Sequence, residues 1–221
     1  MMDPATGFVR ASDHSLLVRL GQEISLEHHR QVVRLLRLLQ ESAIPGVRDL
    51  SPAYSSILIR FHPLELTHAE VEARLRELWP KLESVELPEP KRVEIPVSYG
   101  GEFGPDIEDV ARHCGLSVAE VIALHSGAEY RVYFLGFSPG FAYLGGLAEA
   151  LATPRLAKPR REVPAGSVGI AGQQTGVYPL ATPGGWRLIG RTSLRLFEAG
   201  REPMSLLEIG DLVRFVPEAK T

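Results

Sequence analysis

The sequence has a single cysteine, Cys114, among 221 residues, which excludes an intrachain disulfide and any zinc site built from several cysteines. No apolar run approaches the roughly 18–20 residues that a membrane-spanning helix needs. The first ten residues, MMDPATGFVR, lack the basic end and the apolar core of a signal peptide. These absences predict a cytoplasmic protein that is not attached to a membrane.

An excess of positive charge is also lacking, because the net charge is −3, and general affinity for nucleic acid is therefore not indicated. Residues 153–201 are an exception, with eight basic and two acidic side chains. Seven of those eight are arginine, whose planar guanidinium suits carboxylates and phosphates. However, 20 of the 24 basic residues in the whole chain are arginine. Either an anionic ligand or acidic partner, or simply scattered solvated charge, explains this basic segment.

The hydrophobic pattern of residues 1–88 predicts a compact α+β domain. Ser25 can cap a helix that carries an apolar stripe, and the capping box from Thr67 to Glu70 opens a second helix that ends before Pro80. Short strands are predicted over residues 15–21, 47–50, 56–61 and 83–87. The resulting order βαββαβ indicates a ferredoxin-like domain. The neighbouring His28 and His29 are predicted to lie on the surface and not to share a metal ion.

The second predicted domain, residues 89–221, differs from the first in its glycine content and in the length of its apolar runs. It begins with a strand and two helices, the first of which places Cys114 on its apolar side as a buried structural thiol. Residues 136–190 then hold 11 of the 21 glycines, whereas the first 90 residues hold three. Short apolar runs between Gly/Pro turns are typical of a closed or sandwiched β domain.

Two motifs in this domain resemble functional sequences without meeting their physical requirements. Residues 136–140, GFSPG, match the G-x-S-x-G nucleophile elbow, but the residue after Ser138 is Pro139 and cannot donate a backbone N–H to an oxyanion. The four glycines of GSVGIAGQQTG, at 166, 169, 172 and 176, match neither a dinucleotide fingerprint nor a Walker loop. An anion cradle and tight barrel corners explain their spacing equally well.

Polar residues crowd among the turns of the same domain, and loops on a rigid β scaffold commonly bind ligands. His125, at a helix end, could act as a general acid or base or could be a satisfied structural histidine. No paired carboxylates and no histidine-rich metal motif stand out. The substrate-binding candidates are Arg160, Gln174, Thr175, Tyr178, Trp186, Arg191 and His125.

Four segments, residues 13–21, 100–147, 154–192 and 194–217, carry a resemblance that covers almost the whole chain. Their most specific motifs are GFSPGFAYLGGL, VPAGSVGI, QTGVYP and PGGWRLIGRT. The sequence resembles the KipI or allophanate hydrolase subunit 1 family, also described as carboxyltransferase domain C-D, which includes the B subunit of bacterial ATP-dependent 5-oxoprolinases. The resemblance implies that the C-terminal domain is a cyclophilin-like β-barrel.

The same resemblance implies a non-autonomous enzyme subunit. Family members act with a C subunit, related to allophanate hydrolase subunit 2, and an A subunit to hydrolyse 5-oxoproline to glutamate with ATP, which implies magnesium in the assembled complex. Arg160 and Arg191 suit a carboxylate or phosphoryl group, while Gln174, Thr175 and Tyr178 could orient a lactam and Trp186 could cover its ring. No catalytic residue is assigned. The family also includes an inhibitor of a histidine kinase and carboxyltransferases that act on urea-derived substrates, so these remain alternatives.

Overall fold

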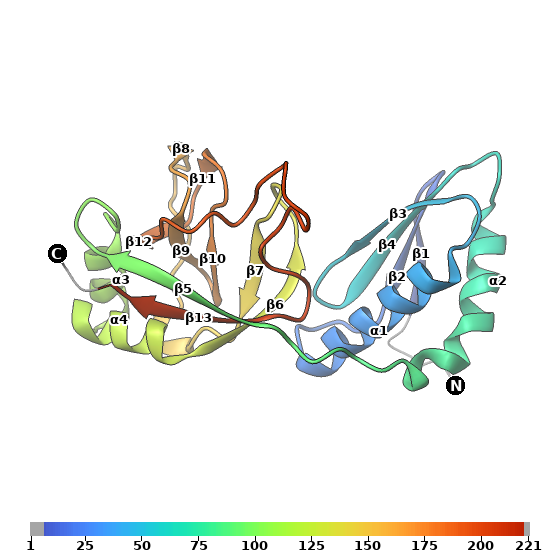
Figure 1. Ribbon diagram of the computed structural model, residues 1–221, viewed down its shortest axis with the longest axis horizontal. Coiled ribbons are helices and arrows are strands. Elements are labelled where there is room, and N and C mark those ends of the chain that lie inside the picture. Colours follow the sequence, from blue (N-terminus) through green and yellow to red (C-terminus); the bar gives the residue numbers. More distant parts are fainter. Residues whose placement is uncertain (1–6, 219–221) are drawn as a thin grey trace. The chain divides into compact units, whose positions relative to one another are not determined.

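The computed structural model describes residues 7–218, which fall into two compact units, one ending at Glu89 and the other beginning at Pro90. The first six residues, part of the stretch that argued against a signal peptide, lie outside the described residues. The chain is α+β, as predicted (Figure 1). None of the helices in the described part is long and apolar enough to cross a membrane.

The N-terminal unit is an antiparallel sheet of order β1-β2-β4-β3 with two α-helices. Its helix α1 begins after Ser25, whose hydroxyl accepts a hydrogen bond from the backbone of His28, and α2 begins at the predicted capping box. Both predicted caps are thus confirmed. The elements are β1 (Gly7–Ser12), β2 (Ser15–Arg19), α1 (Leu26–Ser42), β3 (Val47–Pro52), β4 (Ser56–Phe61), α2 (His68–Leu78) and the 3-10 helix η1 (Trp79–Ser84).

The ferredoxin-like prediction is not confirmed, because residues 83–87 form no strand. Pro80 lies in the first turn of η1, and Pro88 and Pro90 bring no backbone donor to the segment that follows. The sheet edge beside β2 is formed by β1, which the sequence analysis missed because Phe8 and Val9 are adjacent rather than alternating.

The prediction that both neighbouring histidines are surface residues is wrong for His29, which is buried. This residue precedes Val32, Val33 and Leu36 by three, four and seven positions. That spacing places the imidazole on the apolar side of α1, whereas His28 is half-buried beside it.

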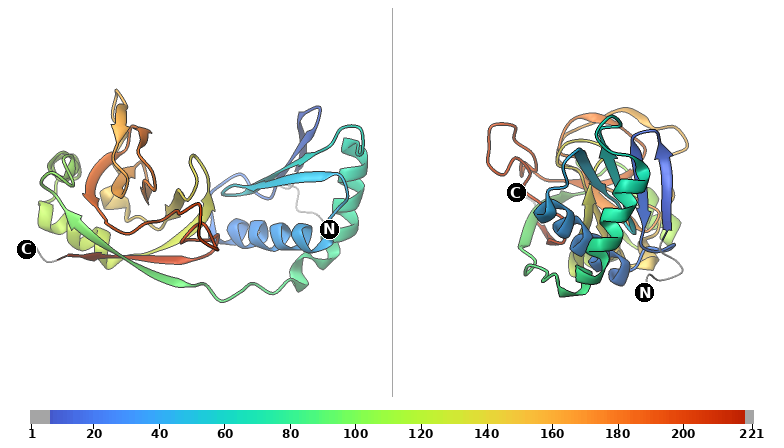
Figure 2. Two further views of the ribbon diagram at one scale, coloured as in Figure 1. Left: turned by 45° about the horizontal axis from the view of Figure 1, so that its top comes forward. Right: turned by 90° about the vertical axis from the view of Figure 1, so that its right-hand side faces the viewer.

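The C-terminal unit contains a closed barrel of order β10-β7-β6-β13-β5-β12-β9, in which only β13 and β5 pair in parallel. A separate ribbon of β8 and β11 projects beyond the barrel strands (Figures 1 and 2). Closure leaves the barrel without an open sheet edge. The barrel strands are β5 (Arg92–Tyr99), β6 (Glu129–Leu135), β7 (Ala142–Gly145), β9 (Ser167–Ala171), β10 (Gln174–Val177), β12 (Arg187–Arg191) and β13 (Leu212–Pro217), and the ribbon strands are β8 (Arg160–Val163) and β11 (Thr182–Gly184).

Helices α3 (Ile107–Cys114) and α4 (Val118–Gly127) pack on β12 and β13, respectively, and a short 3-10 helix, η2 (Glu149–Leu151), lies near both. Gly115 ends α3 in the left-handed conformation, and Ser117 and Glu120 form the predicted capping box of α4. Cys114 is half-buried rather than buried, with its sulfur 3.5 Å from the Thr153 hydroxyl. It packs against the barrel core, so its role is structural.

Two hydrophobic clusters use opposite faces of the same strands. Ala142, Leu144, Val168 and Ile170 belong to the barrel core, whereas Phe141, Ala171 and Leu188 belong to a smaller cluster with Val163 of the ribbon. Strand alternation explains the division, because successive side chains point to opposite faces. The barrel therefore has a second packed layer on its outside.

Candidate functional site

The outer layer is built from aromatic rings that pack against one another. Phe141 lies at the centre, with its ring centroid 5.4 Å from those of Phe137, Tyr178 and Trp186 and 5.0 Å from that of Tyr143. All four pairs are edge-to-face, one of the arrangements that aromatic quadrupoles favour. We call these five residues the aromatic cluster.

The glycine spacing of residues 166–176 is explained by this layer and by two turns. A Cβ on Gly169 would lie 3.1 Å from Cβ of Trp186, and one on Gly176 would lie 3.2 Å from its indole ring. Gly172 and Gly166 have φ angles of +56° and +82°, which favour glycine. The structure thus gives each glycine a packing or turn role, which favours barrel corners over an anion cradle.

Two predicted site residues, Tyr178 and Trp186, are members of the cluster and are almost fully buried, with Trp186 5% exposed. Burial raises the pKa of the Tyr178 phenol, while a hydrogen bond from the Trp186 backbone and the charges of Arg155 and Arg160 oppose that shift. Both rings therefore support the layer and leave little surface for a ligand. Their roles in orienting or covering a lactam stay predictions.

Arg160, at the start of β8, is held by an ion pair beside the cluster. Its Nη2 donates to Oδ1 of Asp106 at 2.7 Å, and Oδ2 of the same carboxylate accepts the Leu188 backbone N–H at 2.7 Å. Asp106 is buried, and Nη1 of Arg160 is buried without a hydrogen-bond partner among residues 7–218. The pair fixes one side of the guanidinium and leaves the other side unsatisfied.

The remaining candidates are divided by the barrel wall. Thr175 points into the barrel, where its hydroxyl donates to the Gly169 carbonyl at 3.0 Å, whereas Gln174 is half-buried one position earlier on β10. Arg191, at the end of β12, donates from Nε to the Ala165 carbonyl at 3.1 Å. Thus Arg160, Tyr178 and Trp186 come together, and Thr175 does not join them.

His125 lies with Thr175 inside the barrel. Because the Thr175 hydroxyl donates to Gly169, it accepts from His125 Nε2 at 2.8 Å, and Nδ1 therefore accepts from the Tyr99 hydroxyl at 2.7 Å. The imidazole is fully buried and stacks on Phe215, with 4.5 Å between ring centroids. Burial lowers the pKa of His125 to about 3, so the ring is neutral at physiological pH. These contacts are those of a satisfied structural histidine.

The G-x-S-x-G match lies in the loop between β6 and β7, and the residues after it form strand β7 instead of the helix that an elbow requires. The Ser138 hydroxyl oxygen is buried and has no hydrogen-bond partner in the described part of the chain. Ser138 therefore lacks an activating base.

The substitution Ser138→Ala is expected to leave both folding and turnover of the assembled enzyme unchanged, because it removes a buried oxygen that makes no hydrogen bond. Steady-state rates and thermal unfolding midpoints of the two proteins measure this. A folded variant with less than a tenth of the original turnover would restore Ser138 as a candidate nucleophile.

The described residues include no group of three or more His, Cys, Asp or Glu side chains placed to hold a metal ion. Cations are nevertheless available for phosphate, since Arg155, Lys158 and Arg161 are exposed beside Arg160. The residue types of the basic segment thus suit the phosphates of a nucleotide.

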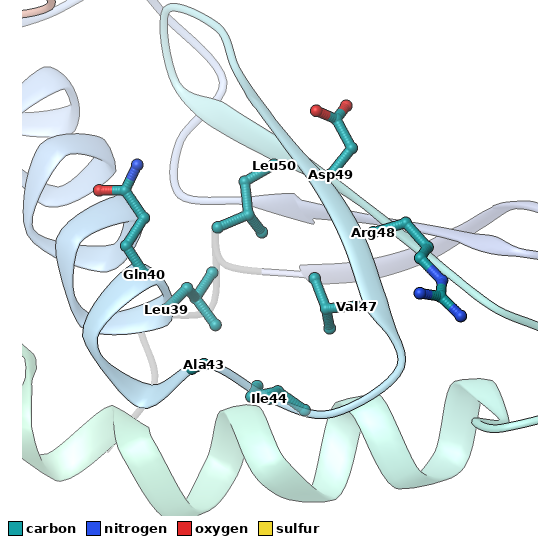
Figure 3. Close-up of a pocket in the computed structure, with 8 residues that line it drawn as sticks. All are labelled: Leu39, Gln40, Ala43, Ile44, Val47, Arg48, Asp49 and Leu50. Atoms are coloured by element: carbon teal, nitrogen blue, oxygen red, sulfur yellow. The ribbon is translucent and has the colours of Figure 1, made fainter.

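A hollow of about 460 Å³ lies in the N-terminal unit between the end of α1 and β3 (Figure 3). Leu39, Val47 and Leu50 line it, whereas Arg48 pairs with Glu65 at 2.6 Å. Asp49 is also paired, with Arg60 at 3.4 Å. The hollow contains none of the predicted site residues, and the charged side chains that line it are held in ion pairs, so it does not resemble a reaction centre.

Sequence reasoning missed Phe137, Phe141, Arg155 and Asp106. The alternation of Phe141 and Tyr143 with Ala142 and Leu144 was a usable signal for two-sided burial. Phe137 and Asp106 each lie in a segment with a different sequence interpretation: Phe137 is part of the G-x-S-x-G match, and Asp106 precedes a predicted helix.

Comparison with known proteins gives a consistent result. The model of the family described as carboxyltransferase domain, subdomain C and D, matches residues 6–207. The chain is 49% identical over 204 residues to a protein named as the B subunit of 5-oxoprolinase in Escherichia coli O157:H7, covering 92% of each chain. It is 44% identical over 218 residues to a protein of the same name from Bacillus subtilis strain 168, covering 92% of this chain and 89% of that one.

A solved structure, that of TTHA0988, is 39% identical and superposes with a TM-score of 0.81. The match covers 94% of this chain but only 40% of that one, so the same fold is part of a longer polypeptide there.

Proposed function

Because the chain belongs to the carboxyltransferase domain C and D family, we propose that it is the B subunit of a 5-oxoprolinase, a hydrolase that opens the lactam of 5-oxoproline to give glutamate. The observation that carries this proposal is the 49% and 44% identity, over 92% of the chain, to two proteins of that name. Identity at this level over nearly the full length argues against a shared fold with an unrelated activity.

The proposed reaction needs an input of energy, because amide resonance makes a lactam carbonyl a poor electrophile. ATP supplies a phosphoryl group that removes this resonance, with magnesium expected beside its phosphates. On this chain, the guanidinium groups of Arg160 and Arg191 are suited to the substrate carboxylate or to the charge of the transferring group. Gln174, half-buried at the start of β10, is suited to hydrogen-bond a lactam.

We propose that the site is completed by a C subunit and an A subunit. Two observations support a composite site. Tyr178 and Trp186 are buried and leave little surface for a ligand, and the fold occurs within a longer polypeptide in TTHA0988. A cytoplasmic location is part of this proposal. Inhibition of a histidine kinase and carboxyl transfer to urea-derived substrates are less favoured, because both relatives carry the oxoprolinase name.

Release of ADP that depends on 5-oxoproline is expected only when this chain is mixed with its C and A subunits. The chain alone and each pair of subunits are expected to give less than a tenth of the rate of the complete mixture. A coupled spectrophotometric assay measures the rate, and the complete mixture without 5-oxoproline is the control for background ATP hydrolysis. Absence of substrate-dependent release from the complete mixture would overturn the proposed function.

A further inference from the structure

Asp106, which directly precedes α3, is fixed to strand β12 by two hydrogen bonds. Its backbone N–H donates to the Leu188 carbonyl at 2.9 Å, and its Oδ2 accepts the Leu188 backbone N–H at 2.7 Å. The segment before it also lies close to this strand, because a Cβ on Gly104 would lie 2.1 Å from the Ile189 carbonyl oxygen. The carboxylate is therefore held at both its backbone and its side chain, and its remaining oxygen, Oδ1, has a fixed position.

This fixed oxygen holds only half of the Arg160 guanidinium. Oδ1 of Asp106 accepts from Nη2 at 2.7 Å. An arginine and a carboxylate commonly pair through two parallel hydrogen bonds, but here the Leu188 N–H occupies the second oxygen. As a result, Nη1 of Arg160 is buried and has no hydrogen-bond partner among residues 7–218. A buried donor on a charged group is costly to leave unsatisfied, and an oxygen of a bound ligand would remove that cost.

The charge of the pair favours a ligand with a single negative charge. Asp106 balances the charge of Arg160, so an anion at Nη1 gains a short charge-assisted hydrogen bond but little net Coulombic attraction. This arrangement suits a carboxylate. The several charges of nucleotide phosphates are better matched by Arg155, Lys158 and Arg161, which are exposed.

Arg160 lies at one end of the ribbon formed by β8 and β11 (Figure 1). It pairs there with Gly184, where a Cβ would lie 2.5 Å from the Tyr178 hydroxyl. Among residues 7–218 the ribbon is a sheet of its own, and no ladder joins it to a barrel strand. Nη1 is closed to solvent whereas the Arg160 side chain is 29% exposed, so a small shift of the ribbon would open Nη1 without breaking the barrel. A site that closes over its ligand excludes water, which strengthens a charged hydrogen bond.

We propose that Arg160 binds the carboxylate of 5-oxoproline through Nη1, and that Asp106 is the positioning residue that holds its guanidinium. This inference rests on the proposed function, which supplies the substrate. One oxygen of the substrate carboxylate accepts from Nη1 while Asp106 keeps Nη2. The guanidinium is then hydrogen-bonded on both sides. Binding is selective for lactams that carry a carboxylate, because a lactam without one leaves Nη1 unsatisfied.

The test is the steady-state kinetics of the complete assembly with its C and A subunits, with 5-oxoproline and ATP varied in turn. Arg160→Met is expected to raise the KM for 5-oxoproline about 30-fold and to leave the KM for ATP unchanged, because one hydrogen bond to a charged group is lost. Asp106→Asn keeps an oxygen for the Leu188 N–H but loses the charge. It is expected to raise the same KM by a smaller factor, about fivefold, because the guanidinium is present but held less firmly. Arg112→Met is the matched control, because Arg112 donates to Asp109 at the same 2.7 Å but is 73% exposed, and it is expected to change neither KM.

The outcomes separate this inference from the proposed function. If the unmodified assembly does not turn over 5-oxoproline, the proposed function fails, and the carboxylate site fails with it. If the unmodified assembly is active and folded Arg160→Met raises the KM for ATP instead, Arg160 belongs to a nucleotide site and the inference alone is overturned. A lower kcat with both KM values unchanged gives Arg160 a structural role and also overturns it. An unchanged KM for 5-oxoproline in Asp106→Asn removes the positioning role of Asp106.

Hydrogen exchange gives a second readout that needs no substitution. Adding 5-oxoproline to the unmodified assembly is expected to slow the exchange of residues 160–163, because the ribbon closes over the bound carboxylate. Unchanged exchange at a saturating concentration of 5-oxoproline would contradict the proposal.

Discussion

Lowering the pH from 6.5 to 4 is expected to reduce the free energy of unfolding by about 3 kcal/mol through His125 alone. In the folded protein burial lowers the pKa of this imidazole to about 3, whereas in the unfolded chain it is near the ordinary value of 6.5. The unfolded state therefore binds a proton throughout this range and the folded state does not. The contribution of neutral His125 to the free energy of unfolding is therefore fully present above pH 6.5 and is lost as the pH falls toward 3.

Among residues 7–218, the groups that contact the buried His125 offer no compensating negative charge. Tyr99 and Tyr130 contact it from β5 and β6, Thr175 from β10 and Phe215 from β13. Burial raises the pKa of both tyrosines, so they remain neutral donors. A protonated imidazole would also lose its Nδ1 acceptor and oppose the Tyr99 hydroxyl.

Urea unfolding at several pH values, followed by tryptophan fluorescence, measures this effect. A Trp79→Phe background leaves Trp186 as the only tryptophan, so that the signal comes from the C-terminal unit. His125→Gln is the matched variant, because an amide can accept from Tyr99 and donate to Thr175 without titrating. It is expected to be less stable at pH 7, since it loses the stacking on Phe215. Its free energy of unfolding is expected to fall between pH 6.5 and 4 with an average slope that is smaller by about 1.2 kcal/mol per pH unit. Identical slopes in the two proteins would contradict a neutral, buried His125.

Local sequence signals predicted the helices of this protein better than its sheets. The capping residues Ser25, Thr67 and Ser117 each fix a helix start through a hydrogen bond to a residue three positions away, so the information is local. Two segments with weak strand signals, residues 7–12 and 83–87, could have paired with β2 at the edge of the sheet. Tertiary contacts, which the local sequence does not show, decide between them. Residues 7–12 formed the strand, and residues 83–87 did not.

The sequence predicted the types of residue in the candidate site, but not which of those residues lie together in the folded protein. His125 and Thr175 are 50 residues apart and meet inside the barrel, while Gln174, next to Thr175, is directed to the other side of the wall. A sequence shows that polar residues crowd in one segment, but the face on which each lies depends on strand register. Phe137 was hidden for a related reason, because its exposure follows from a positive φ that only the folded loop reveals.

Asp106 is expected to be among the most costly residues to truncate, although nothing in its sequence context distinguishes it from an ordinary helix cap. Asp106→Ala removes the partner of a guanidinium that is less than a third exposed and the acceptor of the Leu188 N–H. Breaking such a pair is expected to lower the free energy of unfolding by about 3–5 kcal/mol, because the remaining charge and N–H lose their partners. Urea denaturation of the two proteins measures the difference.

A double-mutant cycle separates the ion pair from the backbone hydrogen bond. Arg160→Met alone leaves a buried carboxylate that still accepts from Leu188, and the Asp106→Ala/Arg160→Met protein has neither charge. If the pair exists to hold Arg160 in place, the double variant is expected to be more stable than the sum of the single changes by about 1–3 kcal/mol. The loss of stability that remains in the double variant, relative to the unmodified protein, then reports on the Leu188 N–H, which has lost its acceptor. If the changes in the free energy of unfolding of the two single variants simply add, Asp106 acts through its hydrogen bond to β12 alone. Arg160 is then not positioned by Asp106, and the structural argument for Arg160 as a fixed binding group is lost.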